Sequence, residues 1–389
     1  MFRRTSVLFA ALLIAGGGVA GAAGPPVSVP LSLPAPSGPD RVGATRLHLV
    51  DAARKDPWRP DTVRELMATV FYPARSARGY PVMPQLTAKE GKLFGETAVI
   101  PHPELPPNED WAATMTHSHL GAPVAAGRHP VLLYTPGLGD PRTVNSGLAE
   151  ELASRGYVVV AMDHPGETFA VEFPDGHVRG FEIPGDPGRT PELYRKAIET
   201  RLADVRFVLG QVTALAAGRN PDAERRPLPS GLTRALDPRR IGVFGHSGGG
   251  AAASEAMHEN PAIDAAVNLE GFLDYIEGDP LPIAAEGTRR PLLLFGTADY
   301  QKAYPRFERS WQAVLAKSPC QVGKSILGDA SHWALTDFAS MVPQLQAAGL
   351  MTEQGRDAFV GAIDPAVSVP AVRAAVVAFF DRHVRRSAS

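Results

Sequence analysis

The chain has 389 residues, of which 44% are hydrophobic and 21% charged, a balance typical of a globular protein with ample material for a core. Its formal net charge is −2, so it lacks the positive charge with which proteins bind nucleic acid. Cys320 is the only cysteine, which excludes an internal disulfide and a zinc site built from cysteines.

The first residues predict a secretory signal peptide over residues 1–23. "MFRR" supplies positive charge, "SVLFAALLIAGGGVA" an apolar stretch and "AGAAG" small residues at which cleavage near Ala22 or Ala23 is expected. The apolar run is shorter than the ~20 residues that a membrane-spanning helix needs. We therefore expect a secreted or periplasmic protein with no transmembrane segment after cleavage. Residues 24–40, rich in proline and glycine, predict an extended linker.

After the linker, short apolar strands alternate with helical patterns. The predicted strands, in chain order, are "RELMATVFYP", "HPVLLYTPG", "GYVVVAMDHPG", "RRIGVFGHS", "AIDAAVNLEG", "RPLLLFGTAD" and "QVGKSILG". The predicted helices are "TVNSGLAEELASR", the long "TPELYRKAIETRLADVRFVLGQVTALAAG" with Thr190 as its cap and Gly218 at its end, and "AVRAAVVAFFDRHV". Buried strands that alternate with helices predict a mostly parallel sheet covered by helices on both faces, in one catalytic domain over 41–389.

One strand end carries a pattern that predicts a catalytic nucleophile. In "IGVFGHSGGGAAAS", Gly245 and Gly249 flank Ser247 in a G-x-S-x-G pattern between a strand and an Ala-rich helix. This is the setting of a nucleophile elbow, where a tight turn presents the serine hydroxyl above the sheet. A dinucleotide-binding loop begins with two glycines two positions apart. Here Gly242 and Gly245 are three positions apart, so the segment does not match that pattern. His246 lies on the wrong side of the tight turn to serve as the base.

A serine nucleophile needs a histidine base and a carboxylate that orients it, and on α/β-hydrolases these follow in the order serine, acid, histidine. His332, in "GDASHWALTDF", lies on a loop after a predicted strand and is our candidate base. His258 lies in the helix after the elbow and His383 in a charged terminal helix, so neither is favoured. Glu270 and Asp299 each end a predicted strand, and the residues themselves leave either open as the acid.

A second donor to an oxyanion is expected from the loop after an earlier strand. In "TPGLGD", Gly137 and Gly139 would let the backbone turn inward so that Leu138 presents its N–H, although an ordinary glycine-rich turn would look the same. The N-terminus of the helix behind Ser247 offers further N–H groups, the first from Gly248.

With these motifs in place, the sequence resembles the plasma-type platelet-activating-factor acetylhydrolase family of α/β-hydrolases. The segments that carry the resemblance are "HPVLLYTPGLGDPRTVNSGLAEELASRGYVVVAMDHPGETFA", "DPRRIGVFGHSGGGAA" and "LGDASHWALTDFA". The resemblance implies that Ser247 is the nucleophile, His332 the base, and the N–H groups of Leu138 and Gly248 the oxyanion hole. It also selects Glu270 as the acid, because the family takes its acid from a segment like "AVNLEGF". The family normally has aspartate at that position and an aromatic residue where Gly248 stands, so its substrate preference need not carry over.

The resemblance implies hydrolysis of short or oxidised acyl chains on phospholipids through an acyl-enzyme, with no metal or organic cofactor. The alternatives are a lipase or a cutinase-like polyester hydrolase, which would use Asp299 as the acid, and a non-catalytic binding protein on the same fold. Substrates would be small-molecule or lipid esters.

The segment after the candidate base has an apolar helical face formed by Trp333, Leu335, Phe338, Met341, Val342 and Leu345. Amphipathic faces usually pack in the core. The other interpretation is that part of this face contacts lipid surfaces peripherally.

Overall fold

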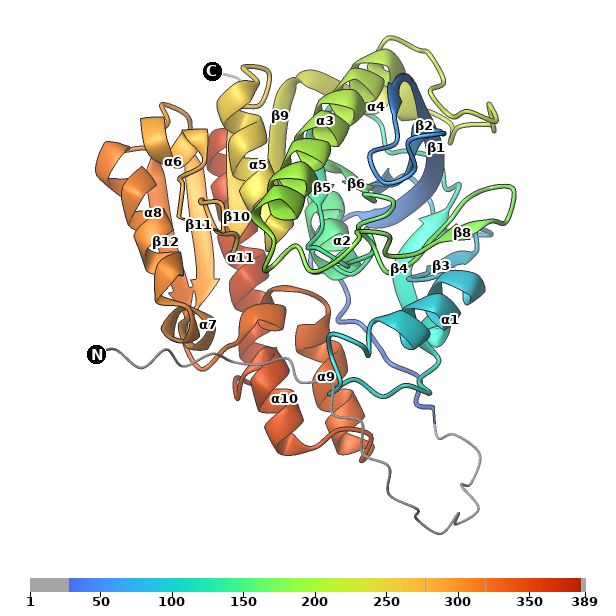
Figure 1. Ribbon diagram of the computed structural model, residues 1–389. Coiled ribbons are helices and arrows are strands. Elements are labelled where there is room, and N and C mark those ends of the chain that lie inside the picture. The colour runs from blue at the N-terminus through green and yellow to red at the C-terminus, as the bar shows by residue number, and fades with distance from the viewer. Residues whose placement is uncertain (1–27, 277, 319, 386–389) are drawn as a thin grey trace, which may run out of the picture.

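A mixed sheet of ten strands runs through the part of the chain that the computed structural model describes, residues 28–276, 278–318 and 320–385 (Figure 1). The predicted signal peptide and the first residues of the predicted linker lie outside these ranges. The strands lie side by side in the order β12-β11-β10-β9-β5-β6-β2-β1-β4-β3. Their bounds are β1 (Arg41–Lys55), β2 (Val63–Ala74), β3 (Val82–Pro84), β4 (Met115–Leu120), β5 (His129–Thr135), β6 (Val158–Met162), β9 (Leu236–His246), β10 (Ala265–Leu269), β11 (Leu292–Thr297) and β12 (Val322–Leu327).

Helices and a small hairpin connect these strands. The hairpin pairs β7 (Val171–Glu172) with β8 (Val178–Arg179). The α-helices are α1 (Ala88–Thr97), α2 (Ser146–Ser154), α3 (Pro191–Ala216), α4 (Leu232–Ala235), α5 (Gly248–Glu259), α6 (Pro282–Glu286), α7 (Ala298–Ala303), α8 (Pro305–Lys317), α9 (Phe338–Ala347), α10 (Glu353–Val360) and α11 (Pro365–His383). Short 3₁₀ turns are η1 (Trp111–Ala113) and η2 (His332–Leu335).

The sheet is parallel where the candidate site residues lie. β6, β5, β9, β10, β11 and β12 pair in parallel, so their carboxyl ends share one edge. The long strands β1 and β2 pair antiparallel with each other, and β2 pairs antiparallel with β6. The prediction did not include β1. The α/β-hydrolase fold, with its mostly parallel sheet, is confirmed.

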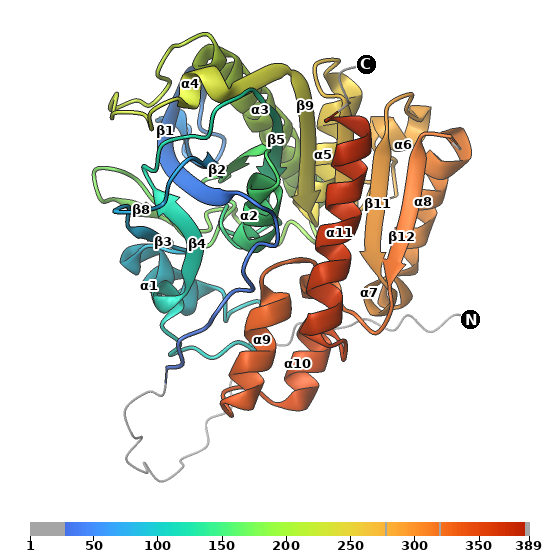
Figure 2. The same ribbon diagram turned by 180° about the vertical axis from the view of Figure 1, so that it is seen from behind.

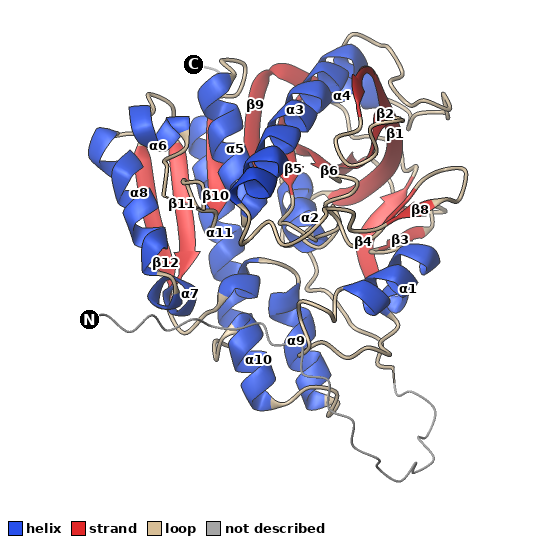
Figure 3. Cartoon of the chain, in the orientation of Figure 1, coloured by secondary structure: helices blue, strands red, loops and turns tan. Residues whose placement is uncertain are grey.

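Helices cover both faces of the sheet, as the pattern predicted (Figures 2 and 3). On one face α3, α5, α6 and α8 pack on the sheet through buried residues such as Val205, Ala253 and Phe307. On the other face α2 and α11 pack through residues such as Leu152 and Phe380. α3 begins at the predicted proline after Thr190 and buries the apolar stripe that includes Leu202, Val205, Leu209 and Val212.

The described part of the predicted linker is extended and packed on the domain. Leu31 and Leu33 are buried in an apolar cluster with α9. The backbone N–H of Ser37 donates to Glu151 of α2 at 2.7 Å, and Arg373 of α11 donates to the carbonyl of Pro34 at 2.8 Å. Residues 28–40 therefore act as a strap across α2, α9 and α11.

Among the described residues, the stretch Glu353–His383 is long and apolar enough to cross a membrane by length and composition alone. The fold divides it into α10 and α11. Val372, Val376 and Phe380 of α11 are buried against the sheet. Core helices can have this composition too, and 33% of the apolar window is buried in the fold.

The apolar face after the candidate base packs in the core. Leu335, Phe338, Met341, Val342 and Leu345 are all buried, and four of them join a cluster with the strap and α10. Trp333 is half-buried, and its ring stacks on Phe359 of α10 with centroids 5.3 Å apart. Of the two interpretations, the structure supports core packing.

Candidate active site

Ser247 lies on a strained turn between β9 and α5. Its backbone has φ 54° and ψ −125°, a region that residues other than glycine rarely adopt and that costs roughly 1–3 kcal/mol. The turn is held because the Ser247 N–H donates to the carbonyl of Leu269 in β10 at 2.8 Å, and the Ser247 carbonyl accepts from Gly250 at 2.8 Å. Such strain is kept where it presents a functional side chain.

Glycine is required beside this turn because backbone passes close by. A Cβ on Gly249 would overlap the carbonyl oxygens of Thr135 and Pro136, and a Cβ on Gly245 would overlap the carbonyl of Gly249. The glycines thus allow the elbow to approach the end of β5, as the motif predicted.

His332 and Glu270 meet at the same edge of the sheet. His332 begins η2, and Glu270 follows β10 with a positive φ of 60°. The two atoms His332 Nδ1 and Glu270 Oε2 lie 3.0 Å apart, and both side chains are buried. When Glu270 is ionised its carboxylate can only accept, so a neutral imidazole paired with it carries its proton on Nδ1 and leaves Nε2 free to take another.

Thr297, at the end of β11, holds the carboxylate of Glu270. Its Oγ1 donates to Glu270 Oε2 at 2.8 Å, and its backbone N–H donates to Oε1. The sequence analysis missed Thr297, although its place at a strand end next to Asp299 was a signal. Thr297 thus fixes the longer glutamate side chain at a position where the resemblance implies aspartate.

Burial shifts the pKa values of both partners toward their neutral forms. It raises the pKa of Glu270 to about 7, against the hydrogen bonds from Thr297, which lower it. Burial also lowers the pKa of His332 well below its usual range, with a smaller effect of the neighbouring His246. The resting imidazole is therefore a free base, as proton abstraction requires.

Two aromatic rings enclose His332. Tyr300 of α7 stacks on it with centroids 4.2 Å apart, and His246 lies on another side at 4.4 Å. His246 Nε2 is 3.1 Å from the carbonyl oxygen of His332, and its Nδ1 faces Asp140 Oδ2 at 3.5 Å. His246, which the sequence analysis excluded as the base, contacts the backbone of the candidate base instead. Tyr300 and Asp140 were not predicted.

The other candidates lie elsewhere. Asp299 is exposed in the first turn of α7, where its backbone N–H donates to the carbonyl of Ala330 at 3.2 Å. The Nδ1 atom of His332, which an orienting acid must contact, is engaged by Glu270. His258 pairs with Glu286 at 3.2 Å, and the ring of His383 lies 4.8 Å from that of Phe379.

The loop after β5 brings a second backbone N–H to the elbow. The nitrogen of Leu138 lies 3.9 Å from the point that a Cβ on Gly248 would occupy. Gly139 adopts φ +88°, and its N–H and carbonyl bond to Glu167 at 2.8 Å and Phe169 at 2.7 Å. Leu138 and Gly248 are thus neighbours, as two donors to one oxyanion would have to be.

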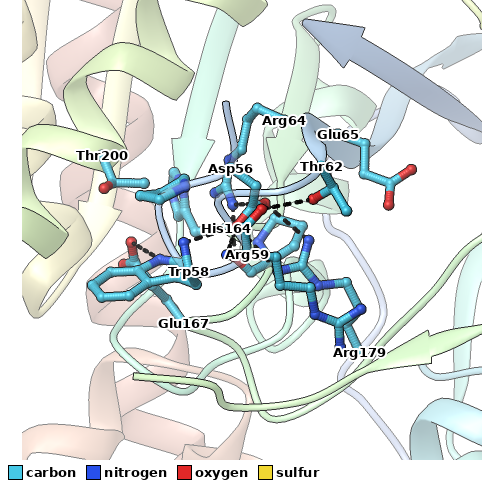
Figure 4. A network of polar contacts seen from close by, with 12 residues as sticks. Asp56, Trp58, Arg59, Thr62, Arg64, Glu65, His164, Glu167, Arg179 and Thr200 are labelled. Atoms are coloured by element: carbon cyan, nitrogen blue, oxygen red, sulfur yellow. Dashed lines mark hydrogen bonds and ion pairs between the residues drawn. The ribbon is translucent and has the colours of Figure 1, made fainter. Parts of the chain in front are cut away.

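A buried charge cluster lies near this loop, and two of its members, Arg201 and Glu167, contact the loop directly. The sequence analysis missed the cluster because its members are far apart in the chain. We define it as Asp56, Arg64, His164, Glu167, Arg179, Arg201 and Asp204, several of which Figure 4 shows. Arg64 pairs with Asp204 at 2.6 Å and Asp56 at 3.0 Å. His164 Nδ1 lies 2.9 Å from Asp204, and its Nε2 lies 2.8 Å from Thr135 Oγ1 at the end of β5.

Comparisons with known proteins find similarity to several esterases. A family model described as platelet-activating factor acetylhydrolase, isoform II, matches residues 113–173. A protein of Arthroderma benhamiae, named a probable 1-alkyl-2-acetylglycerophosphocholine esterase, is 28% identical over 91% of this chain and 89% of its own length. The chain is therefore similar to the platelet-activating-factor acetylhydrolase family.

Two further relatives extend the comparison. The platelet-activating factor acetylhydrolase of Gallus gallus is 23% identical over 45% of this chain and 46% of its own. A solved structure, the ferulic acid esterase from Streptomyces cinnamoneus, is 32% identical with a TM-score of 0.69, over 93% of this chain and 95% of that one. All of these relatives are named for ester hydrolysis, and the chain is a serine ester hydrolase.

Proposed function

We propose that this protein hydrolyses short-chain carboxylic esters through an acyl-enzyme on Ser247. The observation that carries the proposal is the buried contact of His332 Nδ1 with Glu270 at 3.0 Å, beside a serine held at φ 54°. A binding protein without catalysis would have no use for the strain at Ser247 or for a buried carboxylate held against a neutral imidazole.

In the proposed reaction, Ser247 Oγ attacks the ester carbonyl while His332 Nε2 accepts its proton. Glu270 stabilises the imidazolium that forms, and the N–H groups of Leu138 and Gly248 donate to the oxyanion. His332 returns the proton to the leaving alcohol as the carbon–oxygen bond breaks. A water molecule then repeats these steps on the acyl-enzyme, releasing the acid and restoring the Ser247 hydroxyl.

For the substrate we propose a short acyl ester of a phospholipid, which is the chemistry in the name of the Arthroderma relative. The second candidate is an ester of an aromatic acid. It is supported by the ferulic acid esterase likeness and by the ring of Tyr300, which stacks on His332. Tyr300 in turn contacts the rings of Phe272 and Tyr304, of which Tyr304 is 50% exposed. A lipase or cutinase-like route through Asp299 is not favoured, since His332 would first have to leave Glu270.

We place this activity outside the cytoplasm, in a secreted or periplasmic protein. The support is the charged, apolar and small-residue pattern of residues 1–23.

The proposal is tested by Ser247→Ala and by labelling of the wild type with a fluorophosphonate. We expect covalent modification at Ser247, and a loss of p-nitrophenyl acetate turnover of roughly 10⁴-fold or more in the variant, with an unchanged circular dichroism spectrum. A panel of acetyl phospholipid, methyl ferulate and long-chain triglyceride would then rank the substrates. Turnover by Ser247→Ala close to that of wild type would refute the mechanism.

A further inference from the structure

The side chain of Arg201 reaches the oxyanion loop from α3. It is 1% exposed, and its Nη2 donates to the carbonyl of Gly137 at 3.2 Å while Nη1 donates to the carbonyl of Pro136 at 2.5 Å. Its Nε donates to Glu167 Oε2 at 2.7 Å. A single guanidinium therefore donates hydrogen bonds to the two successive carbonyls that precede Leu138.

The hydrogen bond from Arg201 to the Gly137 carbonyl determines where the Leu138 N–H points. The carbonyl of Gly137 and the N–H of Leu138 belong to one peptide group, and no described peptide bond is cis. In a planar trans peptide the C=O and the N–H point in opposite directions. Holding the Gly137 oxygen toward Arg201 turns the Leu138 N–H away from α3, to the side where its nitrogen lies 3.9 Å from the Cβ position of Gly248.

Arg201 is itself held in place by Glu167. Besides the contact with Nε, the carboxylate of Glu167 accepts from Trp58 Nε1 at 3.3 Å, as Figure 4 shows. The backbone carbonyl of Glu167 accepts from the Gly139 N–H at 2.8 Å. One residue thus anchors both the cation and the far side of the oxyanion loop, so the loop is fixed on each side of Leu138.

The charge of Arg201 also acts on the donor electronically. A cation bonded to a carbonyl polarises the peptide group, and its N–H becomes a stronger donor in a low-dielectric interior. Without Arg201, the Pro136 and Gly137 carbonyls would be buried with no charged partner, and the peptide could rotate to direct an oxygen at the developing negative charge.

We propose that Arg201, held by Glu167, is the positioning residue of the oxyanion hole. This inference rests on the proposed function, because it takes Leu138 as an oxyanion donor. It adds a residue that no sequence motif marks, 65 positions from the carbonyl that it binds.

The test compares Arg201→Met and Arg201→Lys with wild type in turnover of p-nitrophenyl acetate. We expect Arg201→Met to lower kcat by about 10–100-fold, somewhat less than outright loss of a donor, with KM changed less than about twofold. Arg201→Lys keeps the charge but cannot bridge both carbonyls, so it should recover part of kcat. A trifluoromethyl ketone, which forms a tetrahedral adduct with the serine, should lose affinity in parallel with kcat, whereas the corresponding methyl ketone should not.

Arg179→Met is the matched control. Arg179 is a buried arginine of the same cluster, paired with Asp56 at 2.9 Å, and its described partners lie outside the oxyanion loop. It should lose thermal stability but keep kcat per folded molecule. If Arg201→Met does not fold, Arg201→Lys and Glu167→Gln carry the same comparison.

The inference is overturned if the folded Arg201 variants keep kcat within about twofold of wild type, if their loss lies only in KM, or if Arg179→Met loses as much kcat. Failure of the proposed function is recognised separately, since the wild type itself would then neither react with the fluorophosphonate at Ser247 nor turn over esters.

Discussion

Two regions beside Ser247 bury ionisable groups in opposite ways. Glu270 and His332 are surrounded mainly by neutral partners, and burial brings the pKa of Glu270 to about 7. In the buried charge cluster, carboxylates face arginines directly. Although burial raises it, the pKa of Asp204 is held well below its usual range by the charge of Arg64 and a hydrogen bond from His164.

The difference follows from what each region does in the proposed reaction. A catalytic base and the acid that orients it must be able to change charge during the reaction. Neither side chain is therefore paired with a permanently charged residue that would fix its protonation state. The cluster holds backbone in place, and the pair of Arg64 with Asp204 serves that purpose because the pKa of Asp204 stays far below neutral pH. Glu167 is the exception within the cluster, since burial raises its pKa to about 7 against the charge of Arg201. The predictions below test this division, starting with the largest effect.

Glu270→Gln should reduce kcat by roughly 10³–10⁴-fold, because the amide no longer stabilises the imidazolium or selects the required tautomer. The fold should survive, since a neutral side chain of the same shape replaces a group that burial already disfavours in its charged form. Steady-state kinetics of Asp299→Asn supply the control, which should stay within a few-fold of wild type. A larger loss in Asp299→Asn would transfer the acid role to that residue.

Asp204→Asn should destabilise the protein by about 3–5 kcal/mol, because it leaves Arg64 buried with one of its charged partners removed. Denaturant unfolding measures this loss, and activity per folded molecule should change far less than in Glu270→Gln. The division between the two regions would fail if Asp204→Asn left stability unchanged or removed activity at full stability.

Leu345→Ala should cost about 2–5 kcal/mol of stability, since this side chain of α9 is fully buried. Turnover of a vesicle-borne phospholipid and of a soluble ester should fall together as the folded fraction falls. A selective loss on vesicles, with the melting temperature preserved, would instead indicate that this face contacts lipid.

Thr297→Val should move the acidic limb of the pH–rate profile to higher pH. The hydroxyl of Thr297 stabilises the ionised form of Glu270, so its removal raises the pKa of that carboxyl further above 7. At pH 6 the variant should therefore lose more kcat/KM, relative to wild type, than at pH 9. An unshifted limb would show that Glu270 does not set the acidic side of the profile.

The smallest expected effect is on how the stability of the protein depends on pH through Glu270. Because the folded-state pKa of Glu270 lies above its unfolded value, the native state binds more protons and this group's contribution to stability falls as pH rises from about 4.5 to about 7. Glu270→Gln removes that dependence. Its melting temperature relative to wild type should thus be higher at pH 8 than at pH 5, and an equal difference at both pH values would contradict a raised pKa.

Local patterns determined a large part of this protein. The alternation of apolar strands and helices predicted the sheet and its two covered faces, since periodicity records which side chains are buried. The G-x-S-x-G motif placed Ser247 on a strand–turn–helix, because only glycine at 245 and 249 admits the passing backbone. His332 was predicted from its loop and from its order along the chain.

The tertiary structure decided what depends on contacts between distant segments. The residues alone left Glu270 and Asp299 open, since both end strands; the approach of Thr297 and His332 to Glu270 distinguishes them. Whether the apolar face of α9 meets lipid or core depended on the strap and α10 that cover it. In the sequence, Arg201 is one more polar position on a predicted helix. Only the packing of α3 against the end of β5 brings its side chain to the carbonyls of Pro136 and Gly137. The sequence could not predict this contact, because a contact between distant segments leaves no periodicity or spacing in the chain.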